Sequence, residues 1–247
     1  MIPFIRGWTD VKRTARANVG LGASLSFVAG ATNAGGFLAV GQYTSHMTGV
    51  VSAIADNLVL GQIALVLAGL ASLIAFRAGA ASTTLIVNWC LRRNLHSAYG
   101  RPLLLEALLL LIFGLFGAGI NFFAGLFVPL TVLVLCYIMG LQNAVITKIS
   151  NAEIRTTHVT GLVTDLGIEL GKMLYVNRLP GEKKVVVSRH KLRIHLILVT
   201  SFFTGGLVGA TGFKLVGYVT TVPLAILLLM LVIRPVMQDI RDAALTR

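Results

Sequence analysis

The stretch SHMTGVVS, residues 45–52, decides how this chain is interpreted, because a closely similar stretch, THVTGLVT, returns at residues 157–164. The first copy reads His46-Met47-Thr48-Gly49, and the second reads His158-Val159-Thr160-Gly161. Histidine is scarce here, with five in the whole chain, so a shared His and a shared Thr-Gly pair are poorly explained by chance. The two stretches therefore indicate an internal repeat.

The similarity continues on both sides of the repeated stretch. The aligned pairs are Asn33 with Asn143, Phe76 with Phe203, and Gly79 with Gly206. The second copy has two extra residues between its Asn and its His. The alignment predicts two repeats, residues 18–120 and 126–234, within one domain that covers residues 1–247.

The composition is typical of a multi-pass membrane protein. Of the 247 residues, 56% are hydrophobic and 12% are charged, and the mean hydropathy is +0.85; soluble domains contain about 25% charged residues. A bilayer core accommodates a helix of roughly 20 apolar residues. The segments that meet this length are 18–40, 62–88, 102–120, 126–147, 193–212 and 214–234.

Two further apolar segments, 47–60 and 158–172, are too short to cross a bilayer comfortably. Each follows a polar stretch without helix character, GQYTS before the first and SNAEIRTT before the second. We therefore predict two half-helices that begin inside the membrane.

The net charge of +12 comes from basic residues in short loops, where they set membrane orientation rather than bind nucleic acid. If all eight segments crossed, the loop RRNLHSAYGR (92–101) would lie outside and the uncharged GINFFAGLF (119–127) inside, against the positive-inside rule. If the two half-helices return to the side they entered, every Lys and Arg except Arg77 and Lys214 is cytoplasmic.

The predicted fold class is therefore an all-α polytopic membrane protein with six transmembrane helices and two re-entrant half-helices. We expect it in the bacterial plasma membrane, with both termini cytoplasmic and a basic cytoplasmic loop at 173–192. Each repeat then crosses three times, so the second repeat is inverted relative to the first (3+3), a plan that secondary transporters share. The two half-helix N-termini would face each other near the midplane, where unpaired N–H groups and the helix dipole favour an anion or a polar solute.

The substrate-binding candidates follow from this geometry. They are His46, Met47, Thr48, Gly49, His158, Val159, Thr160, Gly161, Asn33, Gln142, Asn143 and Arg77. Each group has a structural alternative: the histidines as helix caps or as hydrogen-bond partners that stabilise the break, the threonines as partners of local backbone, the glycines as packing positions and the asparagines as bridges across the helix break. Arg77 has two alternatives: pairing with Glu106, or reaching the cytoplasmic face. Its counterpart in the repeat is Thr204.

Asp165 is the candidate for a coupling proton, and Glu169, on the same helix face, is expected to be solvated at the cytoplasmic end. No catalytic residue, metal site or cofactor is predicted, because the sequence lacks a nucleophile–base or zinc motif. The two cysteines, Cys90 and Cys136, read as small apolar residues rather than as a disulfide.

The motifs Met47-Thr48-Gly49, Gln142-Asn143, Arg155-Thr156-Thr157 and Val159-Thr160-Gly161 resemble those of the YoaK-like family of bacterial integral membrane proteins. The resemblance covers most of residues 20–235. That family has no defined function, so the resemblance implies a fold and not a substrate.

We expect a secondary transporter for a small anion or polar organic solute, which could be proton-coupled. A channel with the same pore, and a structural or partner-binding membrane protein, stay open as alternatives. An intramembrane enzyme is disfavoured. The expected partners are a small-molecule solute and membrane lipids, with basic loop 173–192 suited to anionic lipid; a homodimer is left open, and nucleic acid is not expected.

Overall fold

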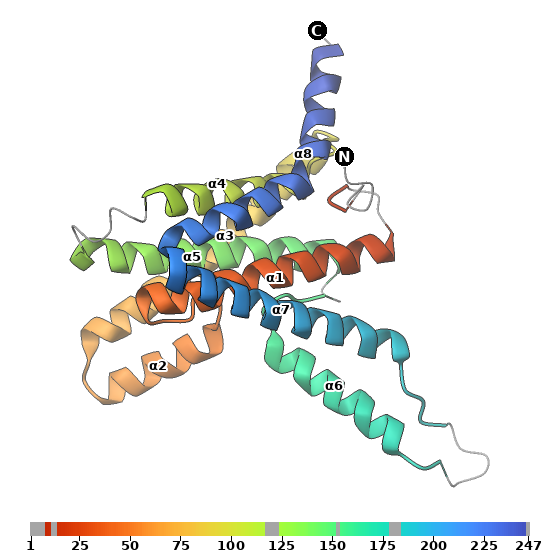
Figure 1. The fold of residues 1–247 in the computed structure, drawn as a ribbon, viewed down its shortest axis with the longest axis horizontal. Coiled ribbons are helices and arrows are strands. Elements are labelled where there is room, and N and C mark those ends of the chain that lie inside the picture. The colour runs from red at the N-terminus through yellow and green to blue at the C-terminus, as the bar shows by residue number, and fades with distance from the viewer. Residues whose placement is uncertain (1–7, 11–13, 117–123, 152–153, 178–183, 246–247) are drawn as a thin grey trace.

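The computed structural model describes residues 8–10, 14–116, 124–151, 154–177 and 184–245 (Figure 1). These residues form eight α-helices and a short 3₁₀ helix, with no β-strand among them. In chain order they are α1 (Ala15–Val40), α2 (Met47–Val59), α3 (Ile63–Arg92), α4 (Gly100–Phe116), α5 (Ala124–Ile149), α6 (Val159–Leu174), α7 (Arg189–Val216), η3 (Gly217–Thr220) and α8 (Thr221–Leu245). The all-helical class predicted from the sequence is confirmed.

The expected apolar segments coincide with helices to within a few residues, with one difference. The segment 214–234 is divided, because α7 continues to Val216 and α8 begins only at Thr221, and α8 extends beyond residue 234 to Leu245. Gly217, with φ of 64°, ends α7 in a left-handed conformation that glycine adopts without strain. Several basic residues, the end of segment 102–120 and part of 119–127 lie outside the described residues. The basic residues concerned are Arg6, Lys12, Arg13, Arg178, Lys183 and Arg247.

Four helical stretches among the described residues are long and apolar enough to cross a membrane. They are Arg16–Val40, Ile63–Arg92, Val128–Ile149 and Arg189–Leu245, the last containing α7, η3 and α8. The short α2 is also apolar. Length and composition thus support a membrane-integral helical protein, as the sequence indicated.

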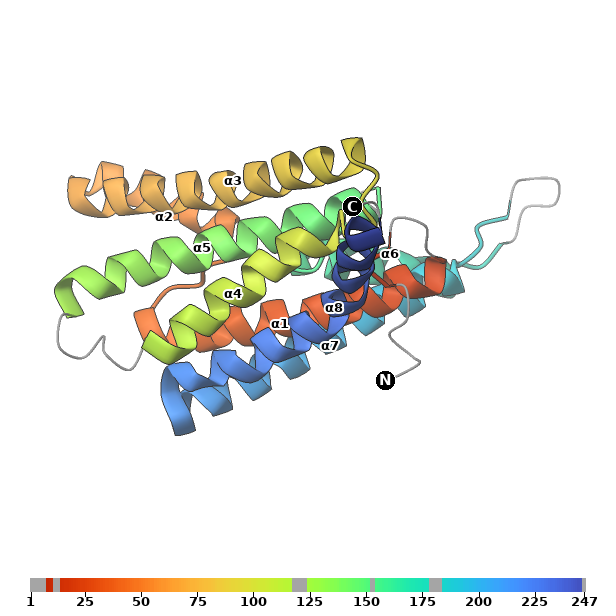
Figure 2. The same ribbon diagram turned by 90° about the horizontal axis from the view of Figure 1, so that it is seen from above.

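The long helices form a bundle whose two faces are covered differently. In Figure 1, α1, α3, α5 and α7 run along the long axis, α4 and α8 lie over one face, and α2 and α6 lie over the other. Seen from above in Figure 2, α3 lies at one edge and α7 at the opposite edge, with α5 and α1 between them. The closest helix pairs are α1 with α7, α3 with α5, and α4 with α8.

The apolar core lies on the side that α4 and α8 cover. Its fully buried leucines include Leu25 on α1, Leu103 on α4, Leu135 on α5 and Leu228 on α8. In contrast, α2 buries only Val50, and α6 buries only Leu162 and Glu169. The two short helices are therefore attached to the bundle rather than built into its core.

Glycines on four helices allow the helix pairs to approach backbone to backbone. A Cβ at Gly30 of α1 would collide with the Phe202 carbonyl oxygen of α7, and one at Gly205 of α7 would collide with the Phe27 carbonyl oxygen of α1. This is the small-residue packing that membrane helices use in place of hydrophobic association.

The same contacts recur between α3 and α5, where α5 takes the place of α1 and α3 takes the place of α7. A Cβ at Gly140 would collide with the Phe76 carbonyl oxygen, and one at Gly79 would collide with the Tyr137 carbonyl oxygen. Gly30 thus corresponds to Gly140 and Gly79 to Gly205.

These reciprocal contacts correct the downstream alignment of the two halves by one residue. The counterpart of Phe76 is Phe202 rather than Phe203, and the counterpart of Gly79 is Gly205 rather than Gly206. The sequence alignment was misled because glycine and phenylalanine each occur twice in succession in FFTGG (202–206). By the same shift, Arg77 corresponds to Phe203 and not to Thr204.

We predict that Gly140→Ala destabilises the protein, whereas Gly167→Ala does not. The methyl group at 140 meets the Phe76 backbone, which cannot yield as a flexible side chain can, and overpacking of this kind costs about 1–3 kcal/mol. Gly167 on α6 has no atom within 4 Å of an added Cβ, and alanine is the better helix former by about 1 kcal/mol. Thermal unfolding of both variants in one detergent checks this; equal midpoints would contradict the proposed close approach.

Candidate functional site

The chain reverses at the end of α1 and again at the end of α5, and each reversal leads to a short helix. Gly41 ends α1 with φ of 73°, and Asn151 follows α5 with φ of 51°, both left-handed. Glycine and asparagine are the residues that adopt this conformation most readily. As Figure 1 shows, α2 and α6 then begin near the middle of the bundle and run toward opposite ends.

Asn33 and Asn143 fasten the returning segments to the helices that precede them. The Asn33 Oδ1 accepts a hydrogen bond from the Ser45 backbone N–H at 3.1 Å. The Asn143 Oδ1 accepts one from the Thr157 hydroxyl at 2.7 Å, while its Nδ2 donates to the Met139 carbonyl at 2.8 Å. The structure thus places both asparagines in the bridging role considered from the sequence.

His46 and His158 occupy the N-cap positions of α2 and α6, but neither side chain caps its helix with a hydrogen bond. Both residues are exposed, and each ring lies across the glycine three positions later, where a Cβ on Gly49 or Gly161 would collide with it. The capping alternative is therefore wrong, and the rings remain accessible at the helix starts.

Each short helix presents hydroxyl groups on its exposed face. Thr48 and Ser52 lie one turn apart on α2, as Thr160 and Thr164 do on α6, and all four are exposed. The Thr164 hydroxyl donates to the Thr160 carbonyl at 2.9 Å. Met47 and Val159, the first residues of the two helices, are half-buried.

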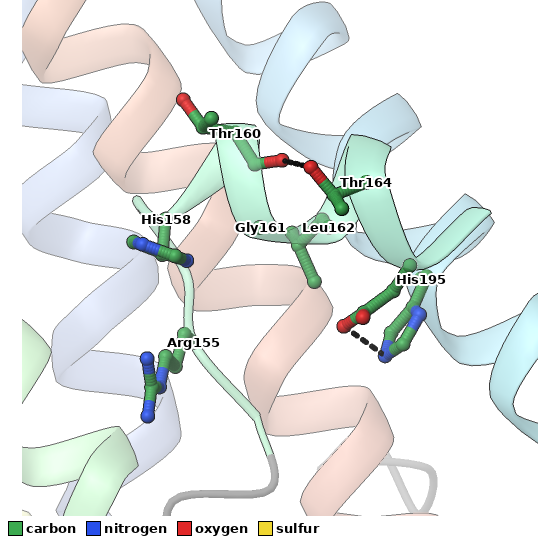
Figure 3. Close-up of a pocket in the computed structure, with 8 residues that line it drawn as sticks. Arg155, His158, Thr160, Gly161, Leu162, Thr164 and His195 are labelled. Carbon is green, nitrogen blue, oxygen red and sulfur yellow. Dashed lines mark hydrogen bonds and ion pairs between the residues drawn. The ribbon is translucent and has the colours of Figure 1, made fainter. Parts of the chain in front are cut away.

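A pocket of about 480 Å³ lies at the start of α6 (Figure 3). It is lined by Arg155, His158, Thr160, Gly161, Leu162, Thr164, Asp165 and His195. In the close-up, Arg155 and His158 project from the segment before α6, and His195 lies at the other end of the pocket. All eight lining residues belong to the second half, so this pocket is not shared with the start of α2 as the sequence led us to expect.

His195 on α7 is the functional candidate that the sequence analysis missed. Its Nε2 lies 3.9 Å from the Asp165 Oδ2, the residue is 9% exposed, and its Nδ1 has no hydrogen-bond partner among the described residues. A histidine just inside an apolar helix was the available signal, but only the packing of α6 on α7 brings it to the repeated motif. Asp165 itself is 54% exposed at the side chain, and its coupling role stays a prediction.

Glu169 was expected to be solvated, and this is wrong. It is 4% exposed, and its two carboxylate oxygens accept hydrogen bonds at 2.7 Å from the Lys172 ammonium and from the Ser188 backbone N–H. The Lys172 bond, followed by the Ser188 bond, holds the pKa of Glu169 below its ordinary value. Glu169 thereby joins the far end of α6 to the start of α7.

The remaining candidates, Gln142 and Arg77, do not line the pocket. Gln142 is fully buried and donates to the Glu106 carboxyl at 3.1 Å, and Arg77 is exposed on α3. The alternative pairing of Arg77 with Glu106 is therefore wrong, because Gln142 occupies that position. Within the described residues, no group of three or more His, Cys, Asp or Glu side chains could hold a metal ion.

The sequence profile of a family described as "Protein of unknown function (DUF1275)" matches residues 21–233. The chain belongs to the DUF1275 family. This match covers both short helices and confirms the family resemblance drawn from the repeated motifs. No curated protein and no solved structure matches this DUF1275 protein.

We predict that Asn143→Leu loosens the start of α6 while leaving the bundle folded. Losing the acceptor for the Thr157 hydroxyl removes about 1 kcal/mol, so amide hydrogen exchange across residues 157–162 should rise about fivefold. Asn88→Leu, at an exposed position on α3, serves as the control and should change nothing there. Unaltered exchange in Asn143→Leu would show that the bond does not hold the segment.

Proposed function

We propose that this protein is a secondary transporter for a small organic anion, which binds at the start of α6. The observation that carries the proposal is the pocket in which Arg155, His158 and the unpaired N–H groups of the first helical turn come together. The side chains of Arg155 and His158 make no hydrogen bond or ion pair within the described residues, and the nearby Asp165 lies beside His195 instead. Such a pocket attracts negative charge.

The chemistry of the lining favours a carboxylate. A guanidinium group binds a planar carboxylate through two parallel hydrogen bonds, and the Thr160 hydroxyl can add a third. Leu162 and Gly161 provide an apolar wall for a short carbon chain. A volume of about 480 Å³ lies within the range of small-molecule sites.

The proposed membrane arrangement has six crossings and two re-entrant half-helices, α2 and α6, in an inverted repeat. The reciprocal glycine contacts of α1 with α7 and of α3 with α5 support it. So do the matched starts of α2 and α6, with Asn33, His46, Thr48 and Gly49 corresponding to Asn143, His158, Thr160 and Gly161. The distribution of basic residues supports the further proposal that both termini lie in the cytoplasm of a bacterial cell.

In this arrangement, the start of α2 is the equivalent of the pocket at α6, and it would bind the solute when the protein is open to the opposite side of the membrane. His46, Met47, Thr48 and Gly49 would contact the solute once the exposed face of α2 closes around it. Alternating access of this kind is how inverted repeats work in transporters. A channel that uses the same residues is the alternative, and single-channel current without saturable uptake would favour it.

A second candidate function is binding of anionic lipid at the cytoplasmic side. A separate pocket of about 460 Å³ lies between the end of α6 and the start of α7, lined by Met173, Val187, Arg189, Leu192, Arg193 and Leu196. Apolar side chains beside two arginines suit a lipid with a negative headgroup. Four of these six residues belong to the basic segment 173–192, whose ends the structure assigns to α6 and α7, so the expected loop is shorter than predicted. This pocket does not compete with the proposed solute site.

We expect Arg155→Ala to weaken carboxylate binding about 10- to 150-fold, because charge-assisted hydrogen bonds contribute about 1.5–3 kcal/mol. Calorimetry with lactate, pyruvate and succinate on the purified protein measures this. His158→Ala should also weaken binding. Arg234→Ala, which removes an exposed arginine of α8 outside the pocket, is the charge-matched control and should bind as the parent does. Absence of binding to all three anions by the parent protein would reject the proposal.

We further expect Arg92→Cys and Val186→Cys to react with a membrane-impermeant maleimide only after cells are permeabilised, and Lys214→Cys to react in intact cells. All three positions are exposed, and both native cysteines are buried, so they give little background. Labelling of residue 92 from outside the cell would refute the six-crossing arrangement.

A further inference from the structure

Glu106 is a carboxyl group in the interior of the bundle, and it has no charged partner within the described part of the chain. It lies on α4, it is fully buried, and its neighbours on that helix are core residues such as Leu103 and Leu110. Ionisable residues at membrane depth are costly and rare, so a buried one calls for a functional explanation.

The only hydrogen bond of the Glu106 side chain within the described residues comes from Gln142 on α5. The Gln142 Nε2 donates to the Glu106 Oε1 at 3.1 Å, and Gln142 is itself fully buried. This leaves the Glu106 Oε2 and the Gln142 Oε1 without partners, although both atoms are enclosed. Two neighbouring acceptors without donors are unfavourable, because each loses its hydrogen bond to water on burial and gains none within the protein.

One proton removes both defects. If the Glu106 Oε2 carries it, the resulting hydroxyl can donate to the Gln142 Oε1, and acid and amide then form two parallel hydrogen bonds. An ionised Glu106 would instead bury a net negative charge against a single neutral donor, which is far more costly.

Among the residues that the structure describes, no counter-ion favours the ionised form of Glu106. The elements packed against α4 are α3, α5, η3 and α8. We leave aside the terminal turns of these elements and the part of α8 beyond Pro235. The ionisable groups that remain on them are Arg77, Cys136, Tyr137, Tyr218 and Arg234. None of these forms an ion pair with Glu106; Arg77 and Arg234 are exposed, and the Tyr137 hydroxyl donates to Ser82 at 2.9 Å.

We propose that Glu106, paired with Gln142, is the proton-binding site of this protein and that it carries one proton per chain. Binding converts the carboxylate to the acid, and release breaks the same O–H bond and returns the proton to water. The position couples this event to the solute pocket: Gln142 precedes Asn143, whose side chain holds Thr157 next to His158. Loss of the proton disrupts the pair at residue 142 and so disturbs the support of the α6 start.

The coupling role rests on the proposed transport function, whereas the proton site itself does not. Asp165, the coupling candidate drawn from the sequence, is more than half exposed, so water can solvate its charge in either access state. Glu106 is the group whose ionisation the fold opposes.

Infrared spectroscopy of the lipid-reconstituted protein tests the proton site directly. At neutral pH we expect a C=O stretching band of a protonated carboxylic acid, which shifts in D₂O and is lost in Glu106→Gln. Glutamine at 106 can still form two parallel hydrogen bonds with Gln142, so this variant should keep its fold. Asp56→Asn, at an exposed carboxylate of α2, should retain the band. Absence of the band in the parent protein, or its persistence in Glu106→Gln, would overturn the proposal.

Gln142→Leu gives an independent readout should Glu106→Gln fail to fold. Without its amide partner the acid loses both hydrogen bonds, so the C=O band should move to higher frequency; an unchanged band would also overturn the proposal.

The coupling role is tested by transport. An inward proton gradient should drive lactate, pyruvate or succinate into proteoliposomes of the parent protein. Glu106→Gln should lose this accumulation but keep solute exchange. Loss of accumulation in Asp165→Asn and not in Glu106→Gln would assign coupling to Asp165, whereas no uptake of any of the three anions would reject the transport proposal and leave the infrared result standing.

Discussion

The backbone approach between α1 and α7, and between α3 and α5, is the contact on which the rest of this structure depends. At Gly30, Gly140, Gly79 and Gly205 the facing helix comes too near for a side chain to fit. In a membrane, helices gain little from burying apolar surface against one another, so close packing at small residues supplies much of their association. Because the two helix pairs use equivalent residues, this one contact also relates the two halves of the chain.

A rigid set of long helices allows the two short ones to remain exposed. α2 and α6 bury few residues, and each is held at its start by an asparagine from the preceding long helix. Helix starts in this position keep their N–H groups available to a ligand, since neither histidine caps them. The arrangement therefore places the proposed anion-binding groups on elements that have few contacts with the rest of the bundle.

The two halves are alike in their backbone but differ in their charges. The pocket at α6 contains Arg155, Asp165 and His195, and the equivalent positions of the first half are Tyr43, Ala53 and Gly69. Ligands shift a conformational equilibrium only by their differential affinity for its states, so an asymmetric set of ionisable groups on a symmetric scaffold would let the two proposed access states differ in affinity. The buried pair of Glu106 and Gln142 adds a second asymmetry, because Gln142 corresponds to Thr32.

The helical membrane class, the family and the bounds of both short helices could be predicted from the amino-acid sequence, because hydropathy and the repeated His-x-Thr-Gly motif are local properties of the chain. The sequence did not determine which side chains meet. Glu169 looked solvated until the packing of α6 on α7 brought Ser188 to it, and His195 lies 3.9 Å from Asp165 through that same packing. The sequence suggested Arg77 as a partner of Glu106, yet the packing of α4 on α5 places Gln142 there instead. Contacts between distant segments follow from the rotation and close approach of packed helices, which no local pattern encodes, so they could not be predicted before the fold was known.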